Sequence, residues 1–204
     1  MVKPKVYITR KIAQAALDMI TPVAEMEVWS EETPPPYEVL LKKVQDIDGL
    51  LALLTDRIDA GLMEAAPKLR VISNLAVGYD NIDIPEATRR GIIVGNTPGV
   101  LTETTADFAF ALLMAAARRV VEADGFTRKG LWKTWGPMVM LGQDIHHATL
   151  GIVGLGRIGV EVAKRAKGFD MEVLYYDPLR RSEIEKELGV EYISELLTLS
   201  LIHI

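Results

Sequence analysis

The sequence contains no cysteine, which excludes disulfide bonds, thiolate metal sites and a cysteine nucleophile. It also has no apolar run of the length that a membrane helix needs, about 20 residues. The most apolar stretch, residues 108–117, is shorter than that, and we expect it to be a helix buried on most sides. The N-terminus lacks the apolar core of a secretory signal. We therefore expect a cytoplasmic protein without a membrane partner.

Positive charge is not in excess, because 23 Lys and Arg residues stand against 28 Asp and Glu, a formal net charge of −5 at pH 7. Such a chain lacks the electrostatic footprint of a protein that binds nucleic acid or an anionic membrane. Its 49% hydrophobic and 25% charged residues are typical of a globular protein. A length of 204 residues allows one large domain or two small ones.

The first half of the sequence alternates between strand and helix patterns. Short apolar strands between helices are typical of a parallel sheet covered on both faces, so we expect a doubly wound domain here. Asp83 and Glu86 have the spacing of a capping box at a helix start. The expected strands are 5–9, 25–29, 50–54, 71–76 and 92–94, and the expected helices are 12–20, 37–45, 59–66 and 83–90.

A second alternating region follows the turn sequence at residues 96–99, which we interpret as a hinge. Thr102 is expected to cap one long helix over residues 103–129. The elements expected after it are strands 149–153, 172–176 and 190–193 and helices from 159 to 167 and over 182–188. The chain thus reads as an α/β protein with two doubly wound parallel-sheet domains, residues 1–98 and 99–204.

The turn after strand 149–153 has the pattern G-x-G-x-x-G. Gly154 allows a tight turn, Gly156 lets the backbone approach a pyrophosphate, and Gly159 lets the helix pack closely. The backbone N–H groups and the positive end of the following helix would then face the phosphates. We expect a dinucleotide site built by Gly154, Leu155, Gly156, Arg157, Ile158 and Gly159, although Arg157 is equally compatible with a solvated helix start.

An acidic residue ends the next strand. Asp177 follows Gly159 by 18 residues, a spacing that suits a carboxylate bonded to the adenosine ribose. A carboxylate there would repel a 2′-phosphate, which favours NAD over NADP, but Arg180 and Arg181 could soften the preference. Pro178 is counted with the cofactor-binding residues. The alternative is that Asp177 is a turn residue before Pro178.

Four stretches of the sequence resemble the D-isomer-specific 2-hydroxyacid dehydrogenase family, and within it the glyoxylate/hydroxypyruvate reductases. They are LAVGYDNID at 75–83, NTPGVLT at 96–102, TTAD at 104–107 with the helix after it, and TLGIVGLGRIG at 149–159. The resemblance implies an N-terminal flavodoxin-like substrate domain and a Rossmann dinucleotide-binding domain. It implies NAD(P)H-dependent reduction of a small 2-keto acid such as glyoxylate or hydroxypyruvate.

The resemblance also implies roles for single residues. The backbone N–H groups of Val77 and Gly78 would hold the substrate carboxylate, unless Gly78 only turns the chain. Leu53 would wall the substrate pocket, or else only pack in the core. Thr105 would lie near the cofactor, or else cap the helix. Trp135 is similar to a tryptophan that some relatives pass across a homodimer, although an ordinary interface or core role is the stronger interpretation.

The catalytic histidine, carboxylate and arginine of the family have no match in this sequence, and no metal site is expected. His146 and His147 lie in a polar connection where a surface role is expected, and His203 lies in the final segment. Residues 198–204 depart from the family pattern, so we expect a truncated Rossmann domain with an exposed sheet edge and a tendency to associate. The alternative functions are a non-catalytic NAD-binding module and an inactive fragment.

Overall fold

The computed structural model describes residues 2–201 and divides the chain into two compact units, the first ending at Val100 and the second beginning at Leu101. In the first unit, every expected strand and helix is present with its ends within two residues of the predicted ones. The elements are β1 (Lys5–Ile8), α1 (Gln14–Ile20), β2 (Glu25–Val28), α2 (Tyr37–Lys43), the 3₁₀ helix η1 (Val44–Asp46), β3 (Gly49–Ala52), α3 (Ala60–Glu64), β4 (Val71–Asn74), α4 (Ile84–Arg90) and β5 (Ile93–Gly95).

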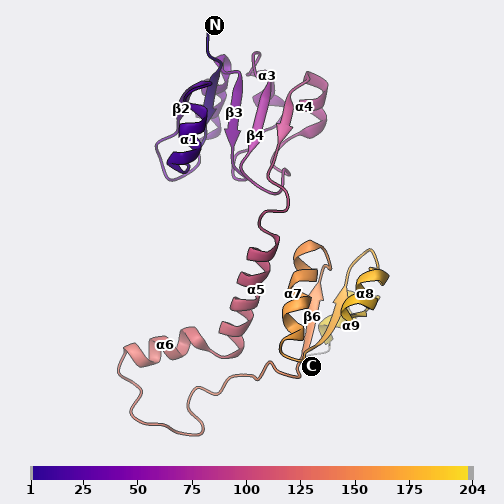
Figure 1. Cartoon of the computed structure of the whole chain (residues 1–204). Coiled ribbons are helices and arrows are strands. Elements are labelled where there is room, and N and C mark those ends of the chain that lie inside the picture. The colour runs from indigo at the N-terminus through magenta and orange to yellow at the C-terminus, as the bar shows by residue number, and fades with distance from the viewer. Residues whose placement is uncertain (1, 202–204) are drawn as a thin grey trace. The chain divides into compact units, whose positions relative to one another are not determined.

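The strands of the first unit form one parallel sheet in the order β2-β1-β3-β4-β5 (Figure 1). This is the flavodoxin-like order, in which the chain reverses direction across the sheet after β2. The carboxyl ends of β3 and β4 therefore lie side by side, and the loops that follow them meet at one edge. The predicted fold class is confirmed.

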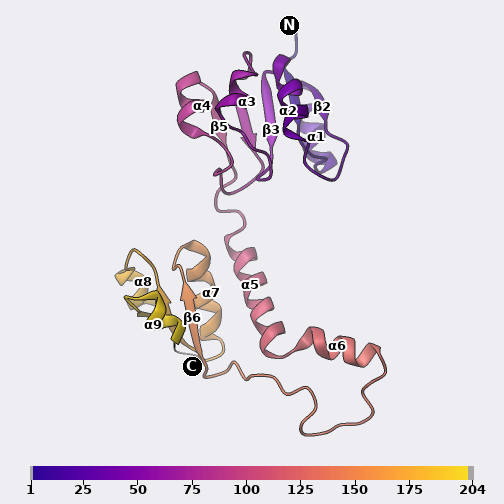
Figure 2. The same cartoon turned by 180° about the vertical axis from the view of Figure 1, so that it is seen from behind.

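One face of this sheet carries the core of the first unit. Tyr7, Leu50 and Ile72 point from three neighbouring strands into a cluster with residues of α2, α3 and α4. Figure 2 shows these three helices in front of the strands and α1 behind them. The expectation that both faces are covered is wrong at one end of the sheet. In the described residues no helix packs over the other face of β4 and β5, and Val71 and Ile93 are 41% and 71% exposed.

Helix α4 illustrates how local sequence sets an element. The Asp83 carboxylate accepts a hydrogen bond from the Glu86 N–H at 3.0 Å, as the capping box predicts. The other half of the box is absent, because the Asp83 N–H donates to the Ile58 carbonyl at 2.9 Å. Glu86 pairs instead with two arginines in the next turn, which lower the pKa of its carboxyl to about 2.

The second unit holds a smaller parallel sheet in the order β6-β7-β8, with β6 at one edge. This matches the first three strands of a Rossmann sheet, taken outward from its centre. The strand predicted at 190–193 is reduced to the two residues of β8. The elements are α5 (Thr102–Ala117), α6 (Val120–Arg128), β6 (Thr149–Val153), α7 (Arg157–Lys167), β7 (Glu172–Tyr176), α8 (Ser182–Leu188), β8 (Glu191–Tyr192) and α9 (Leu196–Leu201).

The long helix expected over residues 103–129 is wrong, because the chain forms two helices there. Arg119 has a φ of 55°, in the left-handed region, and this breaks the run of helical hydrogen bonds between α5 and α6. Thr102 is also not the cap that was predicted. It is the first residue of α5, and the preceding Leu101 makes no side-chain cap hydrogen bond.

The apolar stretch 108–117 is not buried on most sides, which corrects a second expectation. Helix α5 packs against α7 along one stripe, where Phe110 is buried and its ring lies 5.3 Å from that of Phe169. Phe108 and Leu112, on the rest of the helix surface, are 65% and 55% exposed. A helical sequence that is apolar on all sides predicts burial but does not indicate which face packs against which neighbouring element.

The segment between α6 and β6 contains neither helix nor strand, and it exposes Trp132, Trp135 and Met138. It returns to the end of α5, where the Gln143 N–H donates to the Ala117 carbonyl at 2.8 Å. Among the described residues, no helix is both long and apolar enough to cross a membrane.

Candidate functional site

The glycine-rich loop of the second unit joins β6 to α7. Gly154 leaves the strand with a φ of 92°, a conformation that side chains strongly disfavour. Its N–H donates to the Tyr176 carbonyl at 2.7 Å, so the loop starts attached to the end of β7. The tight turn predicted for Gly154 is therefore present.

The other two glycines of the loop have opposite surroundings. A Cβ on Gly159 would lie 2.3 Å from the Gly154 carbonyl oxygen, so α7 can begin this close to the loop only without a side chain. A Cβ on Gly156 would meet no atom within 4 Å. Gly159 is thus required by packing inside the protein. Gly156 leaves open space in front of the first turn of α7, whose N–H groups have no carbonyl partner within the helix.

Asp177 connects this loop to the end of β7. The residue is 9% exposed, and its carboxylate accepts two backbone hydrogen bonds of 2.9 Å, one from the Leu155 N–H and one from the Leu179 N–H. Asp177 therefore does act as a turn residue before Pro178, which was the alternative interpretation. This role does not use up the carboxylate, which offers about four lone-pair positions to donors.

A pocket of about 370 Å³ lies beside the loop. Thr105, predicted near the cofactor, is exposed and is not among the residues around this pocket, whereas Thr102 is. Sequence reasoning missed Thr102 because it assigned that residue to the helix cap. The residues around the pocket are Thr102, Leu155, Gly156, Arg157, Val160, Glu161, Arg181 and Ile184.

Of the two arginines after β7, only Arg181 lines the pocket. Arg180 is paired with the Glu185 carboxylate at 2.8 Å, and its guanidinium lowers the pKa of Glu185 to about 2, with help from the Tyr175 hydroxyl. The pocket therefore combines backbone donors with two cations, Arg157 and Arg181. Pro178 is exposed directly after Asp177, and Ile158 is 42% exposed in the first turn of α7.

In the first unit, Val77 and Gly78 lie half-buried in the loop after β4. Two asparagine side chains bind their carbonyl oxygens. The Asn96 amide donates to the Val77 carbonyl at 2.7 Å, and the buried Asn74 amide donates to the Gly78 carbonyl at 2.9 Å. Asn74 also donates to the side chain of Asn81 at 3.1 Å.

The loop after β3 is attached to the same network. The Asn81 amide donates to the Leu53 carbonyl at 3.1 Å and to the Asp56 carbonyl at 2.9 Å. The Asp56 side chain is buried and accepts hydrogen bonds from the Thr9 hydroxyl and the Leu53 N–H. The structure thus brings Leu53 into one hydrogen-bonded network with the Val77–Gly78 loop.

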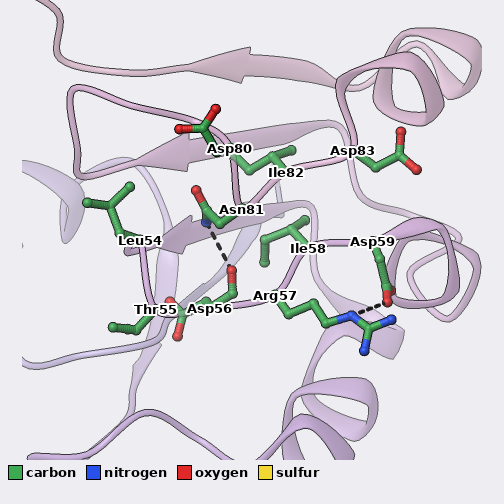
Figure 3. A pocket seen from close by; sticks show the side chains of 10 residues that line it. All are labelled: Leu54, Thr55, Asp56, Arg57, Ile58, Asp59, Asp80, Asn81, Ile82 and Asp83. Atoms are coloured by element: carbon green, nitrogen blue, oxygen red, sulfur yellow. Dashed lines mark hydrogen bonds and ion pairs between the residues drawn. The ribbon is translucent and has the colours of Figure 1, made fainter. Parts of the chain in front are cut away.

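A pocket of about 380 Å³ lies between these two loops (Figure 3). Its wall contains Leu54 rather than Leu53, and a Cβ on Gly78 would lie 3.9 Å from Leu54. Four carboxylates and one arginine surround it, and that arginine pairs with Asp59 at 2.7 Å. This net negative charge would repel a carboxylate substrate. Two of the carboxylates, on Asp59 and Asp83, cap α3 and α4.

His146 and His147 are not part of either pocket. His146 is largely exposed and lies 3.8 Å from Asp144, and His147 is exposed beside it. His203 lies outside the described residues. Within the described part of the chain, no group of three or more His, Cys, Asp or Glu side chains could hold a metal ion.

Comparisons with known proteins agree with the motifs. A family profile described as the catalytic domain of D-isomer specific 2-hydroxyacid dehydrogenases matches residues 6–167. A glyoxylate reductase of Korarchaeum cryptofilum is 62% identical over 192 residues, which are 94% of this chain and 58% of that protein. The chain therefore spans less than two thirds of the length of this relative.

Solved structures with a similar fold also include a protein described as a member of this family. A protein from Thermus thermophilus aligns with a TM-score of 0.86 and 44% identity over 93% of this chain and 60% of its own. A Polaromonas protein described as a putative D-isomer specific 2-hydroxyacid dehydrogenase, NAD-binding, aligns with a TM-score of 0.87 and 33% identity over 97% of this chain and 62% of its own. These matches confirm the resemblance that the four motifs indicated.

Proposed function

Because this chain belongs to the D-isomer-specific 2-hydroxyacid dehydrogenase family, we propose that the whole protein reduces glyoxylate or hydroxypyruvate to the 2-hydroxy acid with NAD(P)H. The observation that carries the proposal is the open space in front of Gly156, at the start of α7 and beside Asp177. The choice of a small 2-keto acid is supported by relatives named glyoxylate reductase.

The proposed cofactor site uses backbone groups more than side chains. The N–H groups at the start of α7 and the helix dipole would hold the pyrophosphate, with Arg157 adding charge. Val160 and Ile184 supply apolar wall in the same pocket. When bound, the nicotinamide cofactor supplies the hydride for the carbonyl carbon. The chain's own role is to hold that cofactor and to exclude water around it.

We propose NAD rather than NADP as the preferred cofactor. If the adenosine ribose binds beside Asp177, a 2′-phosphate would add a second negative charge next to that carboxylate. Arg180 cannot easily compensate, since it is engaged with Glu185. Of the two arginines after β7, Arg181 is the one that lines the pocket, and it is the residue that would allow some binding of NADP.

The substrate carboxylate is proposed to bind the N–H groups of Val77 and Gly78, with Leu53 nearby. This placement is supported by the backbone of the loop, because the N–H groups of Val77 and Gly78 have no acceptor among the described residues. Backbone N–H groups attract an anion without a titratable group, so carboxylate binding there should vary little with pH near neutrality.

A second candidate function is specific to the 204-residue chain. It would bind the dinucleotide without turning over a 2-keto acid, because none of its described residues offers an imidazole at either pocket. We also propose a homodimer, which is supported by the exposed apolar side chains of α5 and of the segment that contains Trp135.

The first prediction tests the cofactor site by NADH fluorescence titration of the purified chain. Gly156→Ala should weaken binding about tenfold or more, because its methyl group would enter the space proposed for the pyrophosphate. Gly125→Ala, in α6 and equally free of neighbours, is the matched control and should bind as the parent does. Saturable NADH binding without glyoxylate turnover supports the second candidate, and rapid turnover excludes it. Absence of any binding would contradict the proposed site.

A further inference from the structure

The loop after β4 presents three successive peptide groups whose carbonyl oxygens are all occupied. Each carbonyl accepts one hydrogen bond from a residue outside the loop. The pairs are the Thr97 N–H to the Ala76 carbonyl at 2.8 Å, the Asn96 amide to the Val77 carbonyl at 2.7 Å, and the Asn74 amide to the Gly78 carbonyl at 2.9 Å.

Occupied carbonyls determine where the neighbouring N–H groups point. In a planar trans peptide the C=O of one residue and the N–H of the next point in opposite directions, and none of the described peptide bonds is cis. The hydrogen bond to the Val77 carbonyl therefore sets the direction of the Gly78 N–H. Among the described residues, the N–H groups of Val77, Gly78 and Tyr79 have no acceptor. They are free for an anion.

We propose that Asn96 is a positioning residue for the substrate, because its side-chain amide turns the Gly78 N–H toward the substrate carboxylate. The inference rests on the proposed function, in which Val77 and Gly78 bind that carboxylate. Asn96 suits this role because it is half-buried and its side chain makes one hydrogen bond among the described residues, to the Val77 carbonyl. Asn74 is fully buried and bonded at two places, so its replacement would disturb the loop more broadly.

The N–H groups of Val77 and Gly78 are oriented by different hydrogen bonds. An experiment can therefore distinguish an effect on one N–H group from a general disturbance of the loop. The Val77 N–H is directed by a backbone bond from Thr97 to Ala76, and no side chain is needed for it. The Gly78 N–H depends on the side chain of Asn96. Removing that side chain should therefore release the Gly78 N–H while the Val77 N–H keeps its direction.

The experiment is amide NMR of the ¹⁵N-labelled 204-residue chain titrated with oxamate, an unreactive carboxylate shaped like a 2-keto acid. In the parent chain, the signals of Val77 and Gly78 should both shift and saturate. In Asn96→Ala, the Gly78 shift should be lost, the Val77 shift should remain, and oxamate should bind about tenfold more weakly. Asn96→Asp, which keeps the shape but places an acceptor beside the Val77 carbonyl, should behave as Asn96→Ala does.

Thr97→Ala is the matched control, because Thr97 acts through its backbone N–H, and it should respond as the parent does. If Asn96→Ala keeps the parent's affinity and Gly78 shift, the inference is overturned and the proposed function stands. If the variants lose both shifts together, Asn96 is only structural and the inference is also overturned. If the parent chain shows no shift at either residue, it is the proposed substrate site that fails.

Discussion

Tyr7 of β1 has a buried hydroxyl group that lacks a hydrogen-bond partner among the described residues. The residue is 1% exposed. Burial raises the pKa of Tyr7 to about 12, with smaller contributions from nearby carboxylates. The neutral ring fits the core of the first unit, whereas the phenolate would not.

We predict that Tyr7→Phe is at least as stable as the parent at pH 7, because no hydrogen bond is lost. The raised pKa gives the sign at high pH. Below the unfolded-state pKa near 10, Tyr7 leaves the free energy of unfolding of the parent unchanged. As pH rises from there through 12, that free energy falls by on the order of 2 kcal/mol, because the unfolded chain ionises first. Urea unfolding between these two pH values measures the difference. Tyr79→Phe, at a half-exposed position, is the control. Parallel curves for parent and Tyr7→Phe would contradict the prediction.

The glycine-rich loop shows how far single residues are predictable. The sequence pattern led to distinct roles for Gly154, Gly156 and Gly159, and the backbone geometry of the loop agrees with each of them. Their binding of a cofactor stays a prediction. The sequence did not indicate Thr102 at the pocket, nor the use of the Asp177 carboxylate by the Leu155 N–H. These depend on contacts between separate elements.

At the scale of elements, local signals predicted the positions of the short helices and strands of the first unit well. Helix α4 begins after its Asp83 cap and ends at Arg90, before Gly91, which has a φ of 71°. Prediction failed at the boundary of α5 and α6. Arg119 adopts a left-handed conformation although no glycine or proline stands there, so the sequence predicted one continuous helix instead of two.

We predict that Asp83→Ala destabilises the first unit by about 1 kcal/mol, because the Glu86 N–H loses its cap. Urea unfolding followed by circular dichroism measures the change in the free energy of unfolding. Asp80→Ala is the control, since Asp80 is exposed in the same loop and should change stability by less than about 0.5 kcal/mol. Equal effects of the two substitutions would show that the cap contributes nothing.

At the scale of the whole molecule, several exposed apolar side chains lie on α5 and in the segment after α6. Phe108 and Leu112 on α5 and Trp135 in the segment after α6 are more than half exposed. Surfaces of this kind are found where another protein binds. Within the proposed homodimer, the same surface of a second copy would cover them.

We predict that the chain sediments as a dimer at micromolar concentration and that Leu112→Asp makes it monomeric. A carboxylate buried against apolar side chains costs several kcal/mol, which is on the order of a hundredfold or more in the dissociation constant. Met19→Asp, on α1 at a position that is 79% exposed against 55% for Leu112, should remain dimeric. Sedimentation velocity makes the comparison. A monomeric parent chain, or a dimer that tolerates Leu112→Asp, would contradict the proposed interface.

The sequence by itself determined the family, the two parallel sheets and the glycine-rich loop, because strand periodicity, caps and glycine patterns act over a few neighbouring residues. Only the tertiary structure decided which sides of α5 are exposed and which asparagines hold the Val77–Gly78 loop. The bond from Asn96 to Val77 joins residues 19 positions apart, on loops after different strands. Such pairs form only when the sheet places the ends of β4 and β5 together, so a pattern of neighbouring residues in the sequence cannot predict them.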